Sequence, residues 1–311
     1  MLTQIVNMHK MNITDEIKTL KKQKDAVILA HYYVTGDVQQ EADYVGDSFY
    51  LAQVAKGVKE KCIVFCGVSF MGESAKILNP QKTVLMPDAK ADCPMAHMVT
   101  AEKIQKMRER YEDLAVVCYI NSTAEIKSFS DVCVTSSNAM KIVKALENKN
   151  IFFIPDGNLG NYIKQQVPEK NIICNDGYCP VHHEITVADV NNAKKAHPQA
   201  KFLVHPECRA EIIELADFTG STSEIINYAA KSDCEEFIIG TEMGVKHELE
   251  IKATGKMFYP VSENLCCKDM KLITLENLRD ALKYDRYEVK VDEAVAQKAY
   301  KPLQRMLDMS K

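Results

Sequence analysis

Short apolar segments recur along the chain, and each of them ends in polar or glycine-containing residues. Stretches with apolar residues at helical spacing separate these segments, which indicates alternating strands and helices with the strands parallel. Nine segments carry the pattern: residues 27–33, 62–67, 83–89, 115–121, 151–157, 172–177, 201–207, 236–242 and 256–261. We therefore predict an α/β fold.

The segments form three sets that repeat at nearly constant intervals. His31, Tyr119 and His205 each end the first segment of a set, at intervals of 88 and 86 residues. The same intervals, or ones within two residues of them, relate three further triples: Asp43, Asp131 and Asp217; Ser48, Ser136 and Thr222; Gly72, Gly160 and Gly244. Such self-similarity predicts an internal triplication, with three homologous parallel-sheet α/β domains of about 85 residues around a pseudo-three-fold axis.

The predicted domains are a first repeat over residues 1–100, a second over 101–186 and a third over 187–311. The third includes a C-terminal tail, which is expected to be a charged loop followed by a helix capped by Asp292 and disturbed at Pro302.

Composition and charge narrow the class of protein. The chain has 311 residues, 46% of them hydrophobic, and a net charge of −4, which excludes a disordered protein and disfavours nucleic acid as a partner. The N-terminal residues lack a basic segment followed by an apolar one, and no apolar run approaches the ~18 residues that span a bilayer. We expect a cytoplasmic protein without a membrane partner. The odd number of cysteines, 11, agrees with a reducing compartment.

Hydroxyl residues mark the start of the second helix in each repeat, within segments 46–48, 135–138 and 220–223. Such residues commonly cap helices by accepting backbone N–H groups. The same helix starts also bind carboxylate or phosphate groups. Both interpretations remain open at this point.

One cysteine per repeat follows the last strand of its set. Cys93, Cys179 and Cys267 lie at intervals of 86 and 88 residues, so three thiolates would converge near the pseudo-three-fold axis. Three thiolates suit one [4Fe–4S] cluster with an open iron that can act as a Lewis acid. A structural zinc site completed by His182 or His183 is the alternative, and Cys266 competes with Cys267. The five cysteines in apolar runs are expected to be buried packing residues: Cys62, Cys66, Cys118, Cys133 and Cys174.

Functional side chains also occur in pairs where the first strand of each repeat ends: His31 and Tyr33, Tyr119 and Asn121, His205 and Glu207. Spacing of two places both members of a pair on one face of a strand. Glu207 could serve as a general base with a pKa raised in a partly dry pocket, and Tyr33 and Tyr119 could donate hydrogen bonds or protons. A single histidine of this kind is more often a core residue. The combination suits small multi-anionic metabolites that undergo dehydration or condensation.

A series of motifs resembles the quinolinate synthase family, the iron–sulfur quinolinate synthetase A family of de novo NAD biosynthesis. The resemblance covers about residues 26 to 282. It rests on AHYY (30–33), ADYVGDS (42–48), PDAKADCPMA (87–96), YINS (119–122), GYCPVH (177–182), VHPEC (204–208), GSTS (220–223) and CKDMKLITLENL (267–278).

The resemblance implies condensation of iminoaspartate (iminosuccinate) with dihydroxyacetone phosphate to quinolinate, with loss of phosphate and two waters. It implies a [4Fe–4S] cluster held by Cys93, Cys179 and Cys267, whose open iron acts as a Lewis acid in dehydration. Catalytic roles fall to Glu207, His205, Tyr33 and Tyr119. The implied substrate-binding residues are His31, Ser48, Tyr119, Ile120, Asn121, Ser136, His205, Pro206, Glu207 and Thr222. An L-aspartate oxidase or dehydrogenase would act upstream.

Two features depart from the family pattern, because Lys268 rather than proline follows Cys267, and Cys266 is directly adjacent. A radical iron–sulfur enzyme of the diphthamide-synthesis type is the competing hypothesis, and it would bind S-adenosylmethionine. A non-catalytic, metal-stabilised binding protein is a further alternative.

Overall fold

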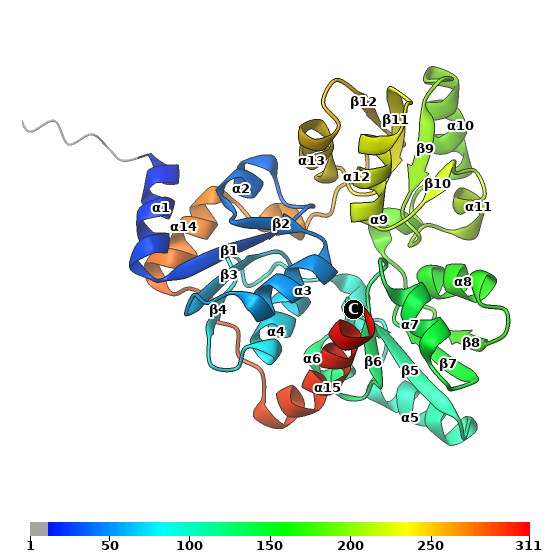
Figure 1. Cartoon of the computed structure of the whole chain (residues 1–311), viewed down its shortest axis with the longest axis horizontal. Coiled ribbons are helices and arrows are strands. Elements are labelled where there is room, and N and C mark those ends of the chain that lie inside the picture. The colour runs from blue at the N-terminus through cyan, green and yellow to red at the C-terminus, as the bar shows by residue number, and fades with distance from the viewer. Residues whose placement is uncertain (1–11) are drawn as a thin grey trace, which may run out of the picture.

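The computed structural model describes residues 12–311 and contains three separate four-stranded sheets. Every strand pair within them is parallel, and each sheet has the same order, in which the second strand of the unit lies at one edge beside the first, followed by the third and fourth. The predicted α/β fold with three homologous parallel-sheet units is confirmed. The three sheets occupy three distinct parts of the molecule around a central region (Figure 1). Residues 1–11 lie outside the described residues. They belong to the N-terminal stretch for which the sequence predicts no targeting signal.

The first unit contains these strands and helices: α1 (Ile13–Gln23), β1 (Ala26–His31), α2 (Gly36–Glu41), β2 (Tyr44–Gly46), α3 (Ser48–Gly57), β3 (Cys62–Cys66), α4 (Ser69–Leu78), β4 (Thr83–Leu85) and the 3₁₀ turn η1 (Pro94–His97). The second unit contains α5 (Ala101–Arg110), β5 (Leu114–Tyr119), α6 (Ala124–Ser128), β6 (Val132–Val134), α7 (Ala139–Ala145), β7 (Asn150–Ile154), α8 (Gly157–Gln166), β8 (Asn171–Cys174) and α9 (Pro180–His183).

The third unit contains α10 (Val187–Ala196), β9 (Lys201–Val204), α11 (Ala210–Ile213), β10 (Phe218–Thr219), α12 (Thr222–Lys231), β11 (Glu236–Gly240), α13 (Val245–Lys252) and β12 (Met257–Pro260). The tail follows with the 3₁₀ turn η2 (Met270–Leu272), α14 (Leu275–Tyr284) and α15 (Glu293–Met309). The predicted domain boundaries at residues 100 and 186 fall between these sheets, and they remain predictions. Among residues 12–311, no helix has the length and apolar character that crossing a membrane requires.

The repeated aspartates have the same structural task in each unit. Asp43, Asp131 and Asp217 precede the second strand, and each accepts a hydrogen bond from a backbone amide of the first strand at 2.7–2.8 Å. Each also donates its own backbone N–H to the same strand residue. This two-point contact sets the register between the edge strand and its neighbour. The regular intervals seen in the sequence therefore report a structural requirement at these positions.

Replacing Asp217 by alanine is expected to lower the free energy of unfolding by about 1.5–3 kcal/mol, because the Phe202 amide loses a charged acceptor in a partly buried site. Urea denaturation of the purified protein measures the change. Asp233→Ala removes an exposed carboxylate nearby and serves as the matched control. Equal stability of the two variants would contradict a role in strand registration.

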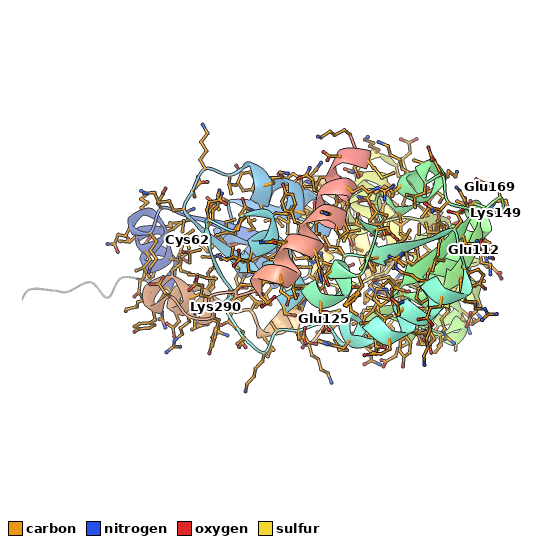
Figure 2. All side chains as sticks on the ribbon, turned by 90° about the horizontal axis from the view of Figure 1, so that it is seen from below. Cys62, Glu112, Glu125, Lys149, Glu169 and Lys290 are labelled. Carbon is orange, nitrogen blue, oxygen red and sulfur yellow. The ribbon has the colours of Figure 1, made fainter. Side chains whose placement is uncertain are left out.

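The C-terminal tail leaves the third unit and packs on the other two. Helix α14 packs against α1 and β3, and α15 packs against α4, α6 and β6. Figures 1 and 2 show α15 lying between the first unit and the second. Asp292 caps α15 as predicted, but the helix continues through Pro302, which is buried within it. The disturbance expected at this proline does not end the helix.

The hydrophobic cores do not correspond one to one with the three sheets. One continuous core contains residues of the first two units together with α14 and α15. The third sheet has two further cores, one on each face, and Tyr32 of the first unit belongs to one of them. The five cysteines predicted to pack in apolar runs follow this scheme, because four are buried and Cys174 is partly buried.

Candidate functional site

A cavity of about 520 Å³ lies where the three units meet, and its lining includes residues of all three. Most of the sequence-predicted site residues line it: His31, Tyr33, Ser48, Cys93, Tyr119, Asn121, Ser136, Cys179, His205, Glu207, Thr222 and Cys267. They come from turns that follow the strands and from helix starts, at the carboxyl ends of the parallel strands, where α/β sheets bind ligands. The residues identified by the repeat intervals therefore lie together in one cavity of the folded protein.

Ile120 and Pro206 are the two predicted residues that do not line the cavity. Each is the middle member of a pair spaced by two residues, and both are buried. Ile120 lies in a bend directly after β5, and Pro206 lies in the turn after β9. Substrate contact by these two residues remains a prediction.

The three hydroxyl residues related by the repeat, Ser48, Ser136 and Thr222, are not the capping residues of their helices. Asp47 caps α3, and Ser221 caps α12 in a capping box with Glu224. Ser48 and Thr222 are therefore the first helical residues, and their side chains line the cavity. Ser136 lies before α7, with its hydroxyl oxygen 3.2 Å from Nε2 of His205. The capping interpretation thus applies to the neighbouring residues and leaves these three hydroxyls facing the cavity.

Glu207 lies almost fully buried between two histidines. Its Oε2 is 2.9 Å from Nδ1 of His182 and 3.2 Å from Nδ1 of His205. Burial alone would raise the pKa of Glu207, but His182 and His205 hold that pKa well below its usual range. Burial lowers the pKa of His205. The prediction that the pKa of Glu207 is raised is wrong. His182, which belongs to the second unit, lies beside Glu207, and the sequence did not indicate this contact. The other oxygen, Oε1, has no hydrogen-bond partner among the described residues.

The Tyr33 hydroxyl joins the first unit to the third. It lies 2.8 Å from the hydroxyl of Thr222 and 2.8 Å from that of Thr241. Thr241 in turn lies 2.9 Å from Nε2 of His182. Burial raises the pKa of Tyr33 well above its ordinary value, and the nearby Glu207 carboxylate raises it further. A chain of hydrogen-bonding groups thus connects Tyr33, Thr241, His182 and Glu207.

His31 and Tyr119 complete the polar wall. Burial lowers the pKa of His31 to about 3, so its imidazole is neutral at neutral pH. The ring packs edge-on against Tyr33 with centroids 4.6 Å apart. Burial also raises the pKa of Tyr119 well above its ordinary value, which keeps this phenol protonated. Both residues can therefore hydrogen-bond a bound molecule without carrying a charge.

Three thiols, one following the last strand of each unit, face this cavity. Burial raises the pKa of all three, that of Cys267 to about 11, and Cys93 interacts electrostatically with both Cys179 and Cys267. Cys266 also lines the cavity, but it is exposed. Thiolate sulfur is the ligand of iron–sulfur clusters, and backbone N–H groups of neighbouring residues act on all three sulfurs in the direction that favours the thiolate. The donor set therefore fits an iron–sulfur centre.

The histidines considered for a zinc site take different places. Nδ1 of His182 lies 3.2 Å from Sγ of Cys179, and these two residues with Glu207 could hold a metal ion. His183 instead packs on Tyr178 and contacts Asn158. Only His182 thus lies beside a predicted cysteine ligand.

Several site residues were not assigned from the sequence. His182 was considered only as a zinc ligand, and Thr241, Glu242 and Lys271 were not considered. Glu242 is 1% exposed, and its carboxylate accepts hydrogen bonds from the backbone amide of Cys267 and from Lys271. The repeat could have pointed to two of these residues. Glu242 lies 86 residues after Asp156, and Thr241 directly follows the third strand of its repeat.

Three α/β units around a cavity lined by thiols, histidines and a buried carboxylate define an enzyme that acts on small molecules. Comparison with known families identifies which one. A family profile described as "Quinolinate synthetase A protein" matches residues 15–308. The chain belongs to this quinolinate synthetase family, whose members act in NAD biosynthesis.

Curated relatives are similar over nearly their whole length. The chain is 56% identical to a quinolinate synthase of Fusobacterium nucleatum over 296 residues, which is 95% of this chain and 99% of the relative. It is 52% identical to a quinolinate synthase of Caldicellulosiruptor saccharolyticus, covering 96% of this chain and 98% of the relative. A third relative, the quinolinate synthase of Clostridioides difficile, is 50% identical over 95% of this chain and 97% of its own. These names do not favour the radical enzyme of the diphthamide-synthesis type.

Proposed function

We propose that this enzyme condenses iminoaspartate with dihydroxyacetone phosphate to quinolinate, with loss of phosphate and two waters. The observation that carries the proposal is the single cavity that gathers one thiol from each unit together with Glu207 and its two histidines. Both substrates are small anions, which suits a cavity of about 520 Å³. An aspartate-oxidising enzyme would supply the imine, and the reaction would take place in the cytoplasm.

Cys93, Cys179 and Cys267 are the residues that would hold one [4Fe–4S] cluster. When bound, the cluster would supply Lewis-acid chemistry at an iron without a protein ligand. Cys267 is favoured over Cys266 because its thiol is mostly buried and is the one that interacts with Cys93. The arrangement of the three units around a pseudo-three-fold axis is part of this proposal.

The starts of α3 and α12 are proposed to bind the anionic groups of the substrates. Both helices have ten residues, and the hydroxyls of Ser48 and Thr222 face the cavity at their first positions. Backbone N–H groups and the positive end of the helix dipole stabilise phosphate and carboxylate groups there. Ser136, His31, Asn121 and the Tyr119 hydroxyl would complete the hydrogen bonds to the substrates. Asn121 Oδ1 is buried and unpartnered among the described residues, so it is free to accept a hydrogen bond from a substrate O–H or N–H group.

Glu207 is proposed as the base of the dehydration steps. Its Oε1 is buried without a partner among the described residues, so a carbon-bound or hydroxyl proton of a bound molecule has a free acceptor. His205 and His182 hold Oε2 and fix the carboxylate in place. Tyr33 is proposed to deliver or remove a proton during tautomerisation of the triose, through a hydroxyl that already lies in a hydrogen-bonded chain.

The proposal is tested with anaerobically purified protein that carries its cluster. Iminoaspartate and dihydroxyacetone phosphate are expected to yield quinolinate, detected by chromatography. Absence of quinolinate from protein with an intact cluster would refute the proposal. Saturable binding of S-adenosylmethionine would support the radical enzyme instead.

Replacing Tyr33 by phenylalanine is expected to lower kcat about 10²-fold, because the variant lacks the hydroxyl proposed to transfer a proton. The ring still packs on His31, but the hydrogen bonds to Thr222 and Thr241 are lost, so the melting temperature should fall by about a few degrees while the protein stays folded. Steady-state assays with cluster content measured in parallel check the result. Tyr50→Phe, at an exposed site of α3, is the control, and equal kcat values for both variants would remove Tyr33 from the chemistry.

A further inference from the structure

The turn that carries Tyr33 is held on both sides by one buried amide side chain. Gln39, in α2 of the first unit, is 3% exposed, and its Nε2 donates to the carbonyl oxygens of Tyr32 and Val34 at 2.9 Å each. These two carbonyls belong to the residues directly before and after Tyr33 in the chain. Gln39 therefore fixes the backbone of the turn around Tyr33.

The same amide also reaches the third unit. Nε2 of Gln39 lies 3.2 Å from the carbonyl oxygen of Gly244, which directly precedes α13. An amide NH₂ group has two hydrogens, so the three carbonyl oxygens share them. One side chain thus links the Tyr33 turn to the unit that supplies Thr222 and Thr241, the partners of the Tyr33 hydroxyl.

The oxygen of this amide shows which end of the side chain the fold uses. Oε1 of Gln39 is buried and has no hydrogen-bond partner among the described residues. An unpaired buried acceptor destabilises a fold. The opposite orientation of the amide would destabilise it more, because it would place Oε1 against the three carbonyl oxygens. Gln39 is therefore held in this site by its N–H groups, and their acceptors are the Tyr33 turn and the third unit.

The third unit lies in close contact with this turn at Gly244. A Cβ atom at Gly244 would lie 2.7 Å from Cα of Tyr33 and 2.8 Å from the carbonyl oxygen of Tyr32. Both are backbone atoms, so only glycine permits this approach. Gly72 and Gly160, which the repeat relates to Gly244, differ, because there the nearest atom to such a Cβ is a side-chain sulfur of the same unit. At Gly244 the glycine instead permits contact between the backbones of two units.

Tyr33 is held by further contacts along its own backbone. Its amide donates to Nδ1 of His31 at 3.2 Å, and its carbonyl oxygen accepts a hydrogen bond from Lys271. Proton transfer requires heavy atoms within hydrogen-bond distance, and a misplacement of about 1 Å can lower a rate about 10²-fold. The place of the turn therefore decides whether the Tyr33 hydroxyl can react.

We propose that Gln39 is a positioning residue for the reaction, which sets the place of the Tyr33 hydroxyl in the cavity by holding the turn around it and joining that turn to Gly244. Gln39 does not line the cavity itself, so it acts through Tyr33. This inference rests on the proposed function, since it presumes proton transfer at the Tyr33 hydroxyl.

The test compares Gln39→Leu with Gln40→Leu in protein that carries its cluster. Leucine has nearly the size of glutamine but donates no hydrogen bond, and Gln40 is the exposed neighbour in the same helix. Gln39→Leu is expected to lower kcat about 10–100-fold, while the KM for dihydroxyacetone phosphate changes by less than about threefold and the cluster content stays at the wild-type level. The kcat of Gln40→Leu should stay within about twofold of the wild type.

A double variant separates positioning from general disruption. In protein that already has Tyr33→Phe the hydroxyl is missing, so adding Gln39→Leu should lower kcat by less than about a further twofold. A merely structural role would lower kcat by the same factor in both backgrounds, and that result would overturn the inference.

Gly244→Ala tests the same contact from the third unit and decides the matter if Gln39→Leu does not fold. The added methyl group meets the backbone of Tyr33, so kcat should fall by about tenfold or more, again with little further loss beside Tyr33→Phe. Gly57→Ala is its control, because a Cβ at Gly57 meets no atom within 4 Å.

Two failures are distinguishable. Wild-type kcat in Gln39→Leu and Gly244→Ala, with a slow Tyr33→Phe, would overturn this inference alone. Wild-type kcat in Tyr33→Phe would remove Tyr33 from the proposed chemistry and this inference with it.

Discussion

Replacing Cys93 by alanine is expected to abolish both the iron–sulfur cluster and quinolinate formation. Cys93 provides the only proposed ligand from the first unit, and its thiol faces the cavity shared with Cys179 and Cys267. With one thiolate missing, a second iron loses its protein ligand, and we expect the cluster to be lost during purification. Iron and sulfide content and the visible absorbance of anaerobically prepared protein measure the effect, with quinolinate formation assayed on the same sample.

Two matched variants make this result specific. Cys234→Ala removes a partly exposed thiol that does not line the cavity and should leave cluster and activity at the wild-type level. Cys266→Ala should also keep the cluster, because Cys267 is the mostly buried neighbour. A full cluster in Cys93→Ala would remove Cys93 from the ligand set, and a lost cluster in Cys266→Ala would transfer the third position to Cys266.

Glu207→Gln is expected to lower kcat by about 10²–10⁴-fold while the cluster stays at its wild-type content. Glutamine has the shape of glutamate but cannot accept a proton at neutral pH, so the base of the dehydration steps is lost. His182 and His205 can still hydrogen-bond the amide oxygen, so the fold of the site should persist. Steady-state assays and cluster absorbance on the same preparation separate chemistry from assembly.

Glu211→Gln offers the control, since Glu211 is an exposed glutamate just downstream that pairs with Arg209. Its kcat should stay within about twofold of the wild type, as expected for a surface charge. Activity of Glu207→Gln at that same level would refute the proposed base.

The fold and most of the proposed site residues were predictable because both follow the internal repeat. The alternation of apolar segments predicted parallel sheets. The repeat intervals identified Asp43, Asp131 and Asp217 as equivalent residues, and the structure shows that each one hydrogen-bonds the first strand of its unit. The three cysteines were found in the same way. A repeat preserves positions that every unit needs for its own folding or for the shared centre, and such positions are visible in a single sequence.

The contacts between units were not predictable from these patterns. The pKa of Glu207 depends on His182 from the second unit, so the expected direction of the shift was wrong. Thr241 and Lys271 of the third unit meet Tyr33 of the first only after the units have come together. Local periodicity describes one unit, whereas these features belong to the assembly.

The placement of α14 and α15 implies that the three sequence repeats do not correspond to three independently unfolding parts of the protein. These two helices join the first and second units to one continuous core, whereas the third sheet is buried against two cores of its own. Cooperative unfolding follows shared burial rather than sequence repetition. Heating should therefore melt the first two units as one block with the C-terminal helices, and the third unit as another, so that a chain of three repeats behaves as a protein of two calorimetric domains.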